Sequence, residues 1–429
     1  MIKEKSEIKI DKLLLYSLMT VVFFPLFPPI FGNTSVHIIP IALLASLGII
    51  FRKRRWFILR KEIIEVKIFF GITFLLLTIS LLCDSMSISE TNFSDFLGVL
   101  KPIYFYIFFI AGFSNVIDDY RIVKTLCVFF EIAIVLSFII AVSEVFFIDM
   151  FKTILYNLFK RQERVVLLDK ATGWFGVTYY FAYFILLLCF YSFFKFVEKL
   201  NLKYSLLFLC SFITLFLTQS RTVILALISG FLLIPFLKLS YVNKKIYVVY
   251  FLFVCILLGV IFNSIDLLKD KLGYAFIGIQ RLFTEGVNIE GGGSGSANIR
   301  VNQVWWAWSN NDLKLIGGGL ARKIQLESVY AAYLYRLGLF YLSFFIYLLF
   351  YFYKISRNLA IYYKKNKLFY AFFSALSVFY LTSPISLFAS ASHEMPKLAF
   401  LFFICSAVVY RFNIKYKKYE QNKYNYTSL

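Results

Sequence analysis

Residues 328–353, SVYAAYLYRLGLFYLSFFIYLLFYFY, form a continuous apolar run that contains a single charged side chain, Arg336. A helix rises about 1.5 Å per residue, so this run is long enough to cross the ~30 Å hydrocarbon core of a bilayer. Backbone groups inside a bilayer must be paired within the protein, and a helix pairs them within its own segment. The run therefore predicts a membrane-spanning α-helix.

Similar runs recur along the whole chain of 429 residues, of which 60% are apolar and 16% charged. The mean hydropathy is +0.76, and a soluble protein of this length would need far more polar surface. We predict an all-α polytopic integral membrane protein with about twelve transmembrane helices. The predicted spans are 13–31, 35–51, 68–83, 96–114, 125–148, 177–197, 204–219, 222–240, 246–265, 328–353, 368–391 and 398–412.

Lysine and arginine residues predict the orientation of these spans. Every second connection is basic, and seven basic segments, counting both ends of the chain, hold 29 of the 45 Lys and Arg residues. Basic connections are typical of the cytoplasmic side, so we expect both termini in the cytoplasm. The net charge of +21 then reflects topology. Nucleic-acid binding is a poor second interpretation, because the charge is divided among short loops instead of forming one patch.

This orientation divides the chain into three predicted parts. Residues 1–265 hold the first nine spans, with an amphipathic interfacial segment near 149–168. Residues 266–327 form a large extracytoplasmic loop with short helices, and residues 328–429 hold the last three spans and a basic cytoplasmic tail. A loop this long is usually a lid or a binding element, and a plain structural cap is the alternative.

The second half of the large loop carries two local patterns. The sequence IRVNQVWWAWSNN predicts a helix in which Val301, Val304, Trp305 and Trp308 form one apolar face. The glycines of the following LIGGGLARK permit tight backbone turns, which would bring the chain close to a ligand.

Several charges are predicted where charge is costly. Arg221 lies at the outer start of one span and Arg336 lies inside another. Glu327 and Tyr330 share a face of the latter helix, and Arg336 points the other way. Ionisable residues inside a membrane are functional candidates by default. The structural alternative is a buried ion pair, for instance with Glu144 near the outer end of another span.

His393, in SASHEMPKLAF, lies between the last two predicted spans. It is a candidate catalytic residue, although a lone histidine at an interface is more often structural. The chain has only two histidines and no spaced acidic cluster, so we expect no tightly held metal ion.

Three passages resemble the O-antigen polymerase (Wzy) and O-antigen ligase families of bacterial envelope glycosyltransferases. TQSRTVILALISG resembles the families' "SR[ST]" start of a span. RVNQVWWAWSNNDLKLIGGGL resembles an outer-loop pattern of an arginine, an aromatic-rich helix and a "GxG" turn. ESVYAAYLYRLGLFYLSFFIYLLF resembles the span that follows. Family members often carry Asp-Asn or His-Asn where this chain has Glu327-Ser328.

The resemblance implies a metal-independent, GT-C-like glycosyltransferase of the bacterial cytoplasmic membrane that needs no cofactor. Its donor would be a growing glycan on undecaprenyl diphosphate and its acceptor a repeat unit on the same lipid. A hydroxyl of the acceptor sugar would attack the anomeric carbon of the donor, and lipid diphosphate would leave. A chain-length regulator protein would be a further partner.

The chemistry of such a reaction assigns roles to the candidate residues. The leaving diphosphate gathers negative charge, which fixed guanidinium groups stabilise. The acceptor hydroxyl needs a proton acceptor, for which Glu327 and His393 are the candidates. The candidates for binding substrate and diphosphate are Arg221, Arg300 and Arg336, then Arg164, Arg281 and Arg322, together with Tyr330.

Other functions stay open from the sequence. An O-antigen ligase would use the same donor and leaving group, so the arginines do not separate it from a polymerase. A lipid-oligosaccharide flippase or another transporter would also suit twelve spans. The absence of an internal repeat and the long outer loop argue against a transporter. A purely structural membrane subunit would not explain arginines at the outer ends of spans.

Overall fold

The computed structural model describes residues 10–26, 36–52, 63–86, 98–114, 117–148, 150, 170–237, 296–319 and 326–427. Within these ranges the protein is all-α, and six helices are long and apolar enough to cross a membrane. These are α3 (Ile64–Met86), α6 (Asp119–Phe146), α9 (Thr178–Glu198), α15 (Val329–Tyr362), α16 (Lys367–Ser386) and α17 (Pro396–Thr427). The prediction of an all-α protein is confirmed for the described residues, and the six long apolar helices fit the predicted multi-pass membrane protein.

The remaining helices are shorter. The apolar ones are α1 (Lys12–Phe23), α2 (Ile38–Phe51), α5 (Lys101–Phe113), α10 (Leu202–Leu217) and α11 (Arg221–Leu233). Outside this group are α14 (Ser296–Ser309) and the single-turn elements η2 (Gly173–Phe175), η3 (Ile234–Leu237) and η4 (Ser392–Glu394). Eleven predicted spans coincide with a described helix. The predicted span 246–265, the interfacial segment near 149–168 (apart from residue 150) and residues 266–295 of the loop lie outside the described residues, so the count of twelve stays a prediction.

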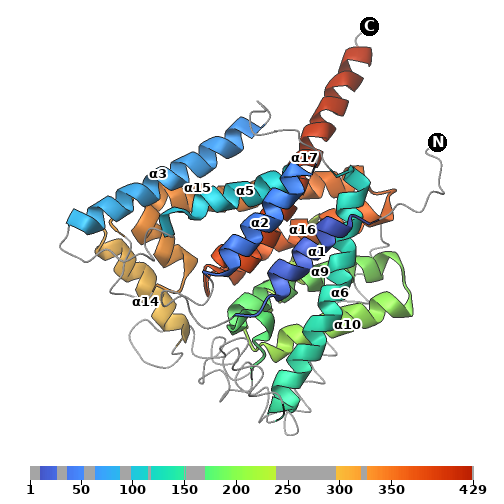
Figure 1. Ribbon diagram of the computed structural model, residues 1–429, viewed down its shortest axis with the longest axis horizontal. Helices are drawn as coiled ribbons and strands as arrows, with labels where there is room; N and C mark the ends of the chain where they lie inside the picture. Colours follow the sequence, from blue (N-terminus) through green and yellow to red (C-terminus); the bar gives the residue numbers. More distant parts are fainter. Residues whose placement is uncertain are drawn as a thin grey trace.

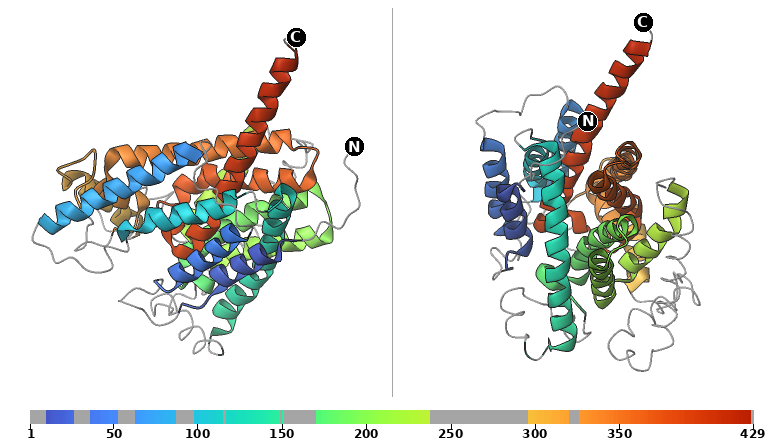
Figure 2. Two further views of the ribbon diagram at one scale, coloured as in Figure 1. Left: turned by 45° about the horizontal axis from the view of Figure 1, so that its top comes forward. Right: turned by 90° about the vertical axis from the view of Figure 1, so that its right-hand side faces the viewer.

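Three helices form the interior of the bundle. The apolar windows of α9, α16 and α17 are 89%, 78% and 94% buried, whereas that of α3 is only 28% buried. Helix α16 packs against α9, α11 and α15, and α17 packs against α5. Helix α3 lies along the edge of the bundle beside α15 (Figures 1 and 2). Burial of this kind distinguishes core helices from an edge helix whose side chains face the surroundings.

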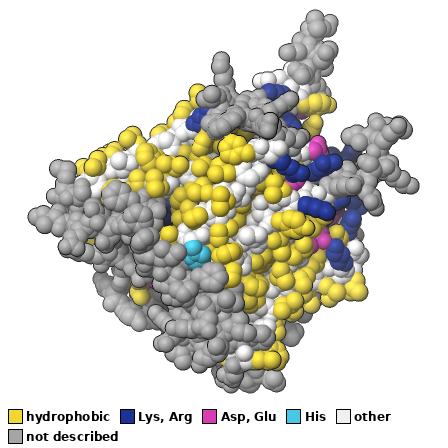
Figure 3. Space-filling model, viewed as in Figure 1, with side chains coloured by type: hydrophobic (Ala, Val, Ile, Leu, Met, Phe, Trp, Pro, Cys, Tyr) yellow, Lys and Arg dark blue, Asp and Glu magenta, His cyan; other side chains and the backbone are white. Residues whose placement is uncertain are grey.

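Charged residues collect at one end of the bundle. Arg52, after α2, pairs with Asp11 before α1 at 2.5 Å. Asp119, at the start of α6, pairs with both Arg411 and Lys415 of α17. On the face drawn in Figure 3, Lys, Arg, Asp and Glu side chains gather toward the right, beside a broad hydrophobic area. The last turns of α17 project beyond the other helices at this end (Figure 1).

Helix α15 is interrupted at Gly338, where φ is +78° and ψ is 174°. The segment after α14 fills this break with its backbone. The N–H of Leu339 donates to the carbonyl of Lys314 at 2.9 Å, and the N–H of Phe340 donates to that of Leu315 at 3.3 Å. The first N–H groups after the break thus gain acceptors that the interrupted helix cannot supply.

The carbonyl groups before the break are paired as well. The N–H of Gly318 donates to the carbonyl of Tyr335 at 2.8 Å, and the Ser80 hydroxyl on α3 donates to that of Arg336. A Cβ on Gly317 would overlap this same carbonyl. The glycines of this segment were predicted to bring the chain close to a ligand. In the structure Gly317 and Gly318 bring it close to the backbone of α15.

We expect Gly338→Ala to destabilise the protein by about 1–3 kcal/mol, because alanine is strained at this φ and its Cβ would overlap the carbonyl of Leu315. The matched control is Gly48→Ala in α2, where a Cβ has open space and alanine favours the helix. Thermal unfolding of the purified protein in detergent measures both. An unchanged midpoint for Gly338→Ala would contradict the structural role of the break.

Candidate functional site

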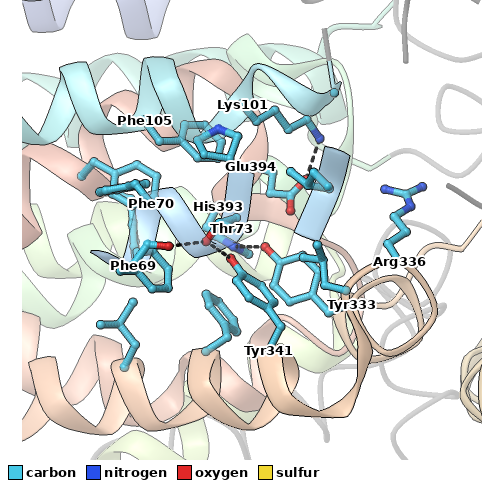
Figure 4. Close-up of a pocket in the computed structure, with 18 residues that line it drawn as sticks. Phe69, Phe70, Thr73, Lys101, Phe105, Tyr333, Arg336, Tyr341, His393 and Glu394 are labelled. Atoms are coloured by element: carbon cyan, nitrogen blue, oxygen red, sulfur yellow. Dashed lines mark hydrogen bonds and ion pairs between the residues drawn. The ribbon is translucent and has the colours of Figure 1, made fainter. Parts of the chain in front are cut away.

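A pocket of about 720 Å³, including its open mouth, lies between α3, α5, α15 and α17 and is bordered by η4 (Figure 4). Most of its wall is apolar and aromatic. The polar part consists of side chains from four different elements. The polar and charged residues that line it are Thr73, Lys101, Tyr333, Arg336, Tyr341, His393 and Glu394.

Lys101 and Glu394 form an ion pair in this pocket, with Nζ 2.6 Å from Oε2. Lys101 is the first residue of α5 and Glu394 ends η4, so the pair joins segments 293 positions apart. Burial raises the pKa of the Glu394 carboxyl, but the Lys101 ammonium, His393 and the donors close to the carboxylate together outweigh this and hold the pKa at about 2. The carboxylate is therefore ionised at neutral pH.

His393 lies in the interior beside this pair and is only 2% exposed. Its ring stacks on Phe345, with centroids 4.7 Å apart, and its Nε2 lies 2.7 Å from the hydroxyl of Tyr333. Burial lowers the pKa of His393 to about 4, more than Glu394 raises it. The imidazole is therefore neutral at pH 7.

The four side chains form a continuous series of contacts. Lys101 pairs with Glu394, His393 directly precedes Glu394 in the chain, and the Tyr333 hydroxyl shares a hydrogen bond with Nε2 of His393. The other ring nitrogen of His393, Nδ1, is buried and has no hydrogen-bond partner within the described part of the chain.

Arg336 lies at the edge of the same pocket, one turn after Tyr333 and two residues before the break at Gly338 (Figure 4). Tyr330 faces a different neighbour, because its hydroxyl donates to the carbonyl of Pro384 on α16 at 2.7 Å. The arginine therefore borders the pocket, and the tyrosine anchors the first turn of α15 against α16.

A second polar cluster lies where α14 meets the start of α15. The Arg300 guanidinium pairs with Glu327 at 2.9 Å, and its Nε donates to the carbonyl of Ala389 at 3.0 Å. The N–H of Glu327 donates to Oε1 of Gln303 at 3.0 Å. The side chain of Arg300 is 11% exposed and that of Glu327 is 33% exposed. Two residues singled out from sequence are thus in direct contact.

The packing of α14 differs from the predicted apolar face. Trp305 and Trp308 are 60% and 39% exposed, whereas Ala307 is buried and Trp306 packs on Tyr335 with ring centroids 5.0 Å apart. Of the predicted apolar face, Val304 packs against the core, so the face is only partly covered by the protein. The side of α14 that packs on the protein also carries a charged residue, Arg300, which is buried.

The connection between α16 and α17 joins the two clusters. Ala389 in this connection accepts the hydrogen bond from Arg300, and His393 and Glu394 lie four and five positions later on the pocket wall. The N–H of Val329, at the start of α15, donates to the carbonyl of Leu387 at 3.4 Å. A short stretch of backbone therefore contacts both clusters.

Of the other arginines predicted to bind diphosphate, only Arg221 belongs to the described residues. Arg221 is the first residue of α11 and is not among the residues that line the pocket. Arg164, Arg281 and Arg322 lie outside the described residues. Glu144, the suggested ion-pair partner, accepts hydrogen bonds from the backbone N–H groups of residues 172 and 173 at 2.7 and 2.9 Å.

Sequence reasoning did not select Lys101 or Tyr333. Lys101 could have been found as a charged residue at the start of a predicted span, followed by Pro102, which favours a helix start. Tyr333 has no distinguishing signal among the 30 tyrosines of the chain. Only the packing of α15 against η4 sets it apart.

An aromatic pocket with cations at one end suits an amphiphile with an anionic group, because the chain part needs apolar contact and the charged part needs paired donors. Within the described ranges, no three His, Cys, Asp or Glu residues are close enough together to hold a metal ion.

No protein-family model matches this chain, and no curated protein matches its sequence.

We expect His393 to make stability depend on pH. Its pKa is about 4 in the folded protein against 6.5 for an ordinary histidine, so between these values only the unfolded chain takes up the proton. Acidification from pH 6.5 to 4 should lower the free energy of unfolding by about 1.4 kcal/mol per pH unit. Thermal unfolding of wild type and His393→Gln across this range measures the effect, which the variant should lose. Equal slopes would contradict the burial of a neutral imidazole.

Proposed function

We propose that this protein is a membrane glycosyltransferase of the O-antigen polymerase kind. It would transfer a growing glycan from undecaprenyl diphosphate to the non-reducing end of a lipid-linked repeat unit, at the outer side of the bacterial cytoplasmic membrane. The observation that carries the proposal is the amphiphilic pocket, in which Phe-rich walls lead to Lys101 and Arg336. A polyprenyl diphosphate has the same division into an apolar chain and an anionic group.

The charges at the pocket favour an anion. Two cationic side chains, Lys101 and Arg336, line the polar end of the pocket, and Lys101 is paired with Glu394. As the glycosidic bond to diphosphate breaks, negative charge grows on the leaving oxygens, and a guanidinium fixed nearby stabilises it. Lys101 can contribute further if its ammonium is shared between Glu394 and the diphosphate.

Exposure distinguishes the two candidate proton acceptors. Glu327 is 33% exposed and is oriented by Arg300, so an acceptor hydroxyl can reach its carboxylate. His393 is 2% exposed and contacts Tyr333. We therefore assign proton acceptance to Glu327 and propose that His393 positions Tyr333 and Glu394.

The predicted topology is consistent with this assignment. The alternation of basic connections puts the start of α5, the start of α15 and the α16–α17 connection on the outer side. These are the segments that carry Lys101, Arg336, His393 and Glu394, and they meet in one pocket. Lipid-linked glycans are polymerised on that side after they have been flipped.

A ligase or a flippase would use the same lipid, and the products in a deletion strain distinguish them. Loss of a polymerase leaves single repeat units on the final acceptor, whereas loss of a ligase leaves polymer on the lipid carrier. Loss of a flippase keeps the repeat unit on the cytoplasmic side. Long polymer on the lipid carrier in the deletion strain would contradict polymerase function.

We expect Arg336→Ala and Arg300→Ala each to lower polymer formation by about 10²-fold or more, since each removes a charge that would stabilise a developing anion or orient the base. Lys314→Ala is the matched control, because this exposed lysine stands over Trp308 and is not part of the pocket wall. Polymer length ladders from a complemented deletion strain provide the measurement, with membrane levels of each variant checked in parallel. Normal ladders for both arginine variants would contradict the site assignment.

Glu327→Gln should keep a hydrogen bond to Arg300 but remove the proton acceptor, so we expect transfer to fall about 10²-fold or more. Binding of lipid-linked donor should change little. Asp312→Asn, at an exposed residue of the same segment, is the control. His393→Gln should reduce transfer less than Glu327→Gln does. The reverse order, measured by in vitro chain extension with purified protein, would reassign the base to His393.

A further inference from the structure

A second pocket lies between α15 and α17, near the end of α15 that is remote from the break at Gly338. It encloses about 770 Å³, including open space at its mouth. Its wall has an aromatic part, formed by Tyr347, Phe350 and Tyr351, and a polar part nearer the charged end of the bundle. The proposed glycosyl-transfer reaction makes no use of this pocket.

The polar part is built from the same two residue types on both helices. Helix α15 contributes Lys354 and Asn358, and α17 contributes Asn413 and Lys417. In each helix the lysine and the asparagine are four residues apart, which places them on one face, one turn from each other. Two ammonium groups and two amide groups therefore border one space, and all four can donate hydrogen bonds to an anion.

Within the described residues these two lysines, Lys354 and Lys417, have no anionic partner. Both are exposed, and neither forms an ion pair with a residue in the described part of the chain. Among the described residues, no acidic side chain lines the pocket. Glu65, which lies close enough to Tyr351 of the pocket wall to interact with it electrostatically, accepts a hydrogen bond from the hydroxyl of Tyr410. The described wall of the pocket thus carries two positive charges and no negative one.

The aromatic part continues this pocket along the outside of α15. Tyr347 is 61% exposed and Phe350 is 46% exposed, and Tyr347 stacks on Tyr351 with centroids 6.3 Å apart. Exposed aromatic side chains on a membrane-spanning helix face lipid, and tyrosine is enriched at the level of the headgroups. A ligand held by the lysines would extend along this aromatic surface.

We propose that the α15–α17 pocket binds the headgroup of an anionic phospholipid, with Lys354 and Lys417 on the phosphate and the aromatic side chains beside the acyl chains. Clusters of lysine at the end of a membrane-spanning helix attract anionic lipids. The amide groups of the two asparagines can donate further hydrogen bonds to the phosphate oxygens. The exposed aromatic surface favours a lipid over a soluble anion.

The experiment titrates the purified full-length protein in detergent with phosphatidylglycerol and, separately, with phosphatidylcholine, and counts bound lipids by native mass spectrometry. Lys354→Gln/Lys417→Gln should weaken phosphatidylglycerol binding about tenfold or more and leave phosphatidylcholine binding unchanged. Lys365→Gln/Lys418→Gln removes the same charge from the connection that follows α15 and from α17, outside the pocket wall, and should change binding less than about twofold. Lys354→Arg/Lys417→Arg should retain it.

Several outcomes would overturn the proposal. Equal losses in the two glutamine variants would mean a general charge effect without a site. Equal affinity for the two lipids would exclude recognition of the anionic headgroup. Displacement of phosphatidylglycerol by millimolar inorganic phosphate would indicate a site for a soluble anion. Thermal unfolding of each variant verifies the fold. The outcome does not depend on whether the protein polymerises glycans, because lipid binding is measured without substrate.

Discussion

The interaction on which the site depends is the filling of the α15 break by the backbone that follows α14. An unpaired N–H or C=O group in an apolar environment costs several kcal/mol, so a helix interrupted at Gly338 is stable only if another segment supplies partners. The carbonyls of Lys314 and Leu315 and the N–H of Gly318 do so. This requirement fixes the loop, and the loop in turn holds α14 and Arg300 against the start of α15.

The same constraint governs the polar groups of the pocket. Lys101, Glu394, Tyr333 and His393 lie among phenylalanine side chains, where an unpaired charge would be costly. Each therefore has a partner, and the partners come from α5, η4 and α15. Pairing of this kind restricts the relative positions of three elements, because a shift of any one would leave a buried charge or a buried hydroxyl without its partner.

Sequence patterns predicted the helices well and the site only partly. Span positions follow from the length of apolar runs, a local property, and so helices were found where α9, α15 and α16 lie. Arg300, Glu327, Arg336 and His393 were recognised because a charged or titratable residue near a span is conspicuous. Lys101 was missed because its role depends on Glu394, 293 positions away. Trp305 belongs to the predicted apolar face and is nevertheless 60% exposed, because periodicity identifies an apolar face without revealing what covers it.

Helix α15 itself indicates how the bundle is positioned in a membrane. No charged residue occurs between Arg336 and Lys354, and this interval corresponds to about 27 Å of helix, close to the ~30 Å thickness of the hydrocarbon core. The pocket with Lys101 and Glu394 lies at the Arg336 end of this interval. The pocket with Lys417 lies at the Lys354 end. The polar part of each pocket is therefore placed near one boundary of the hydrocarbon, where a headgroup resides, and the aromatic part of each extends toward the acyl chains.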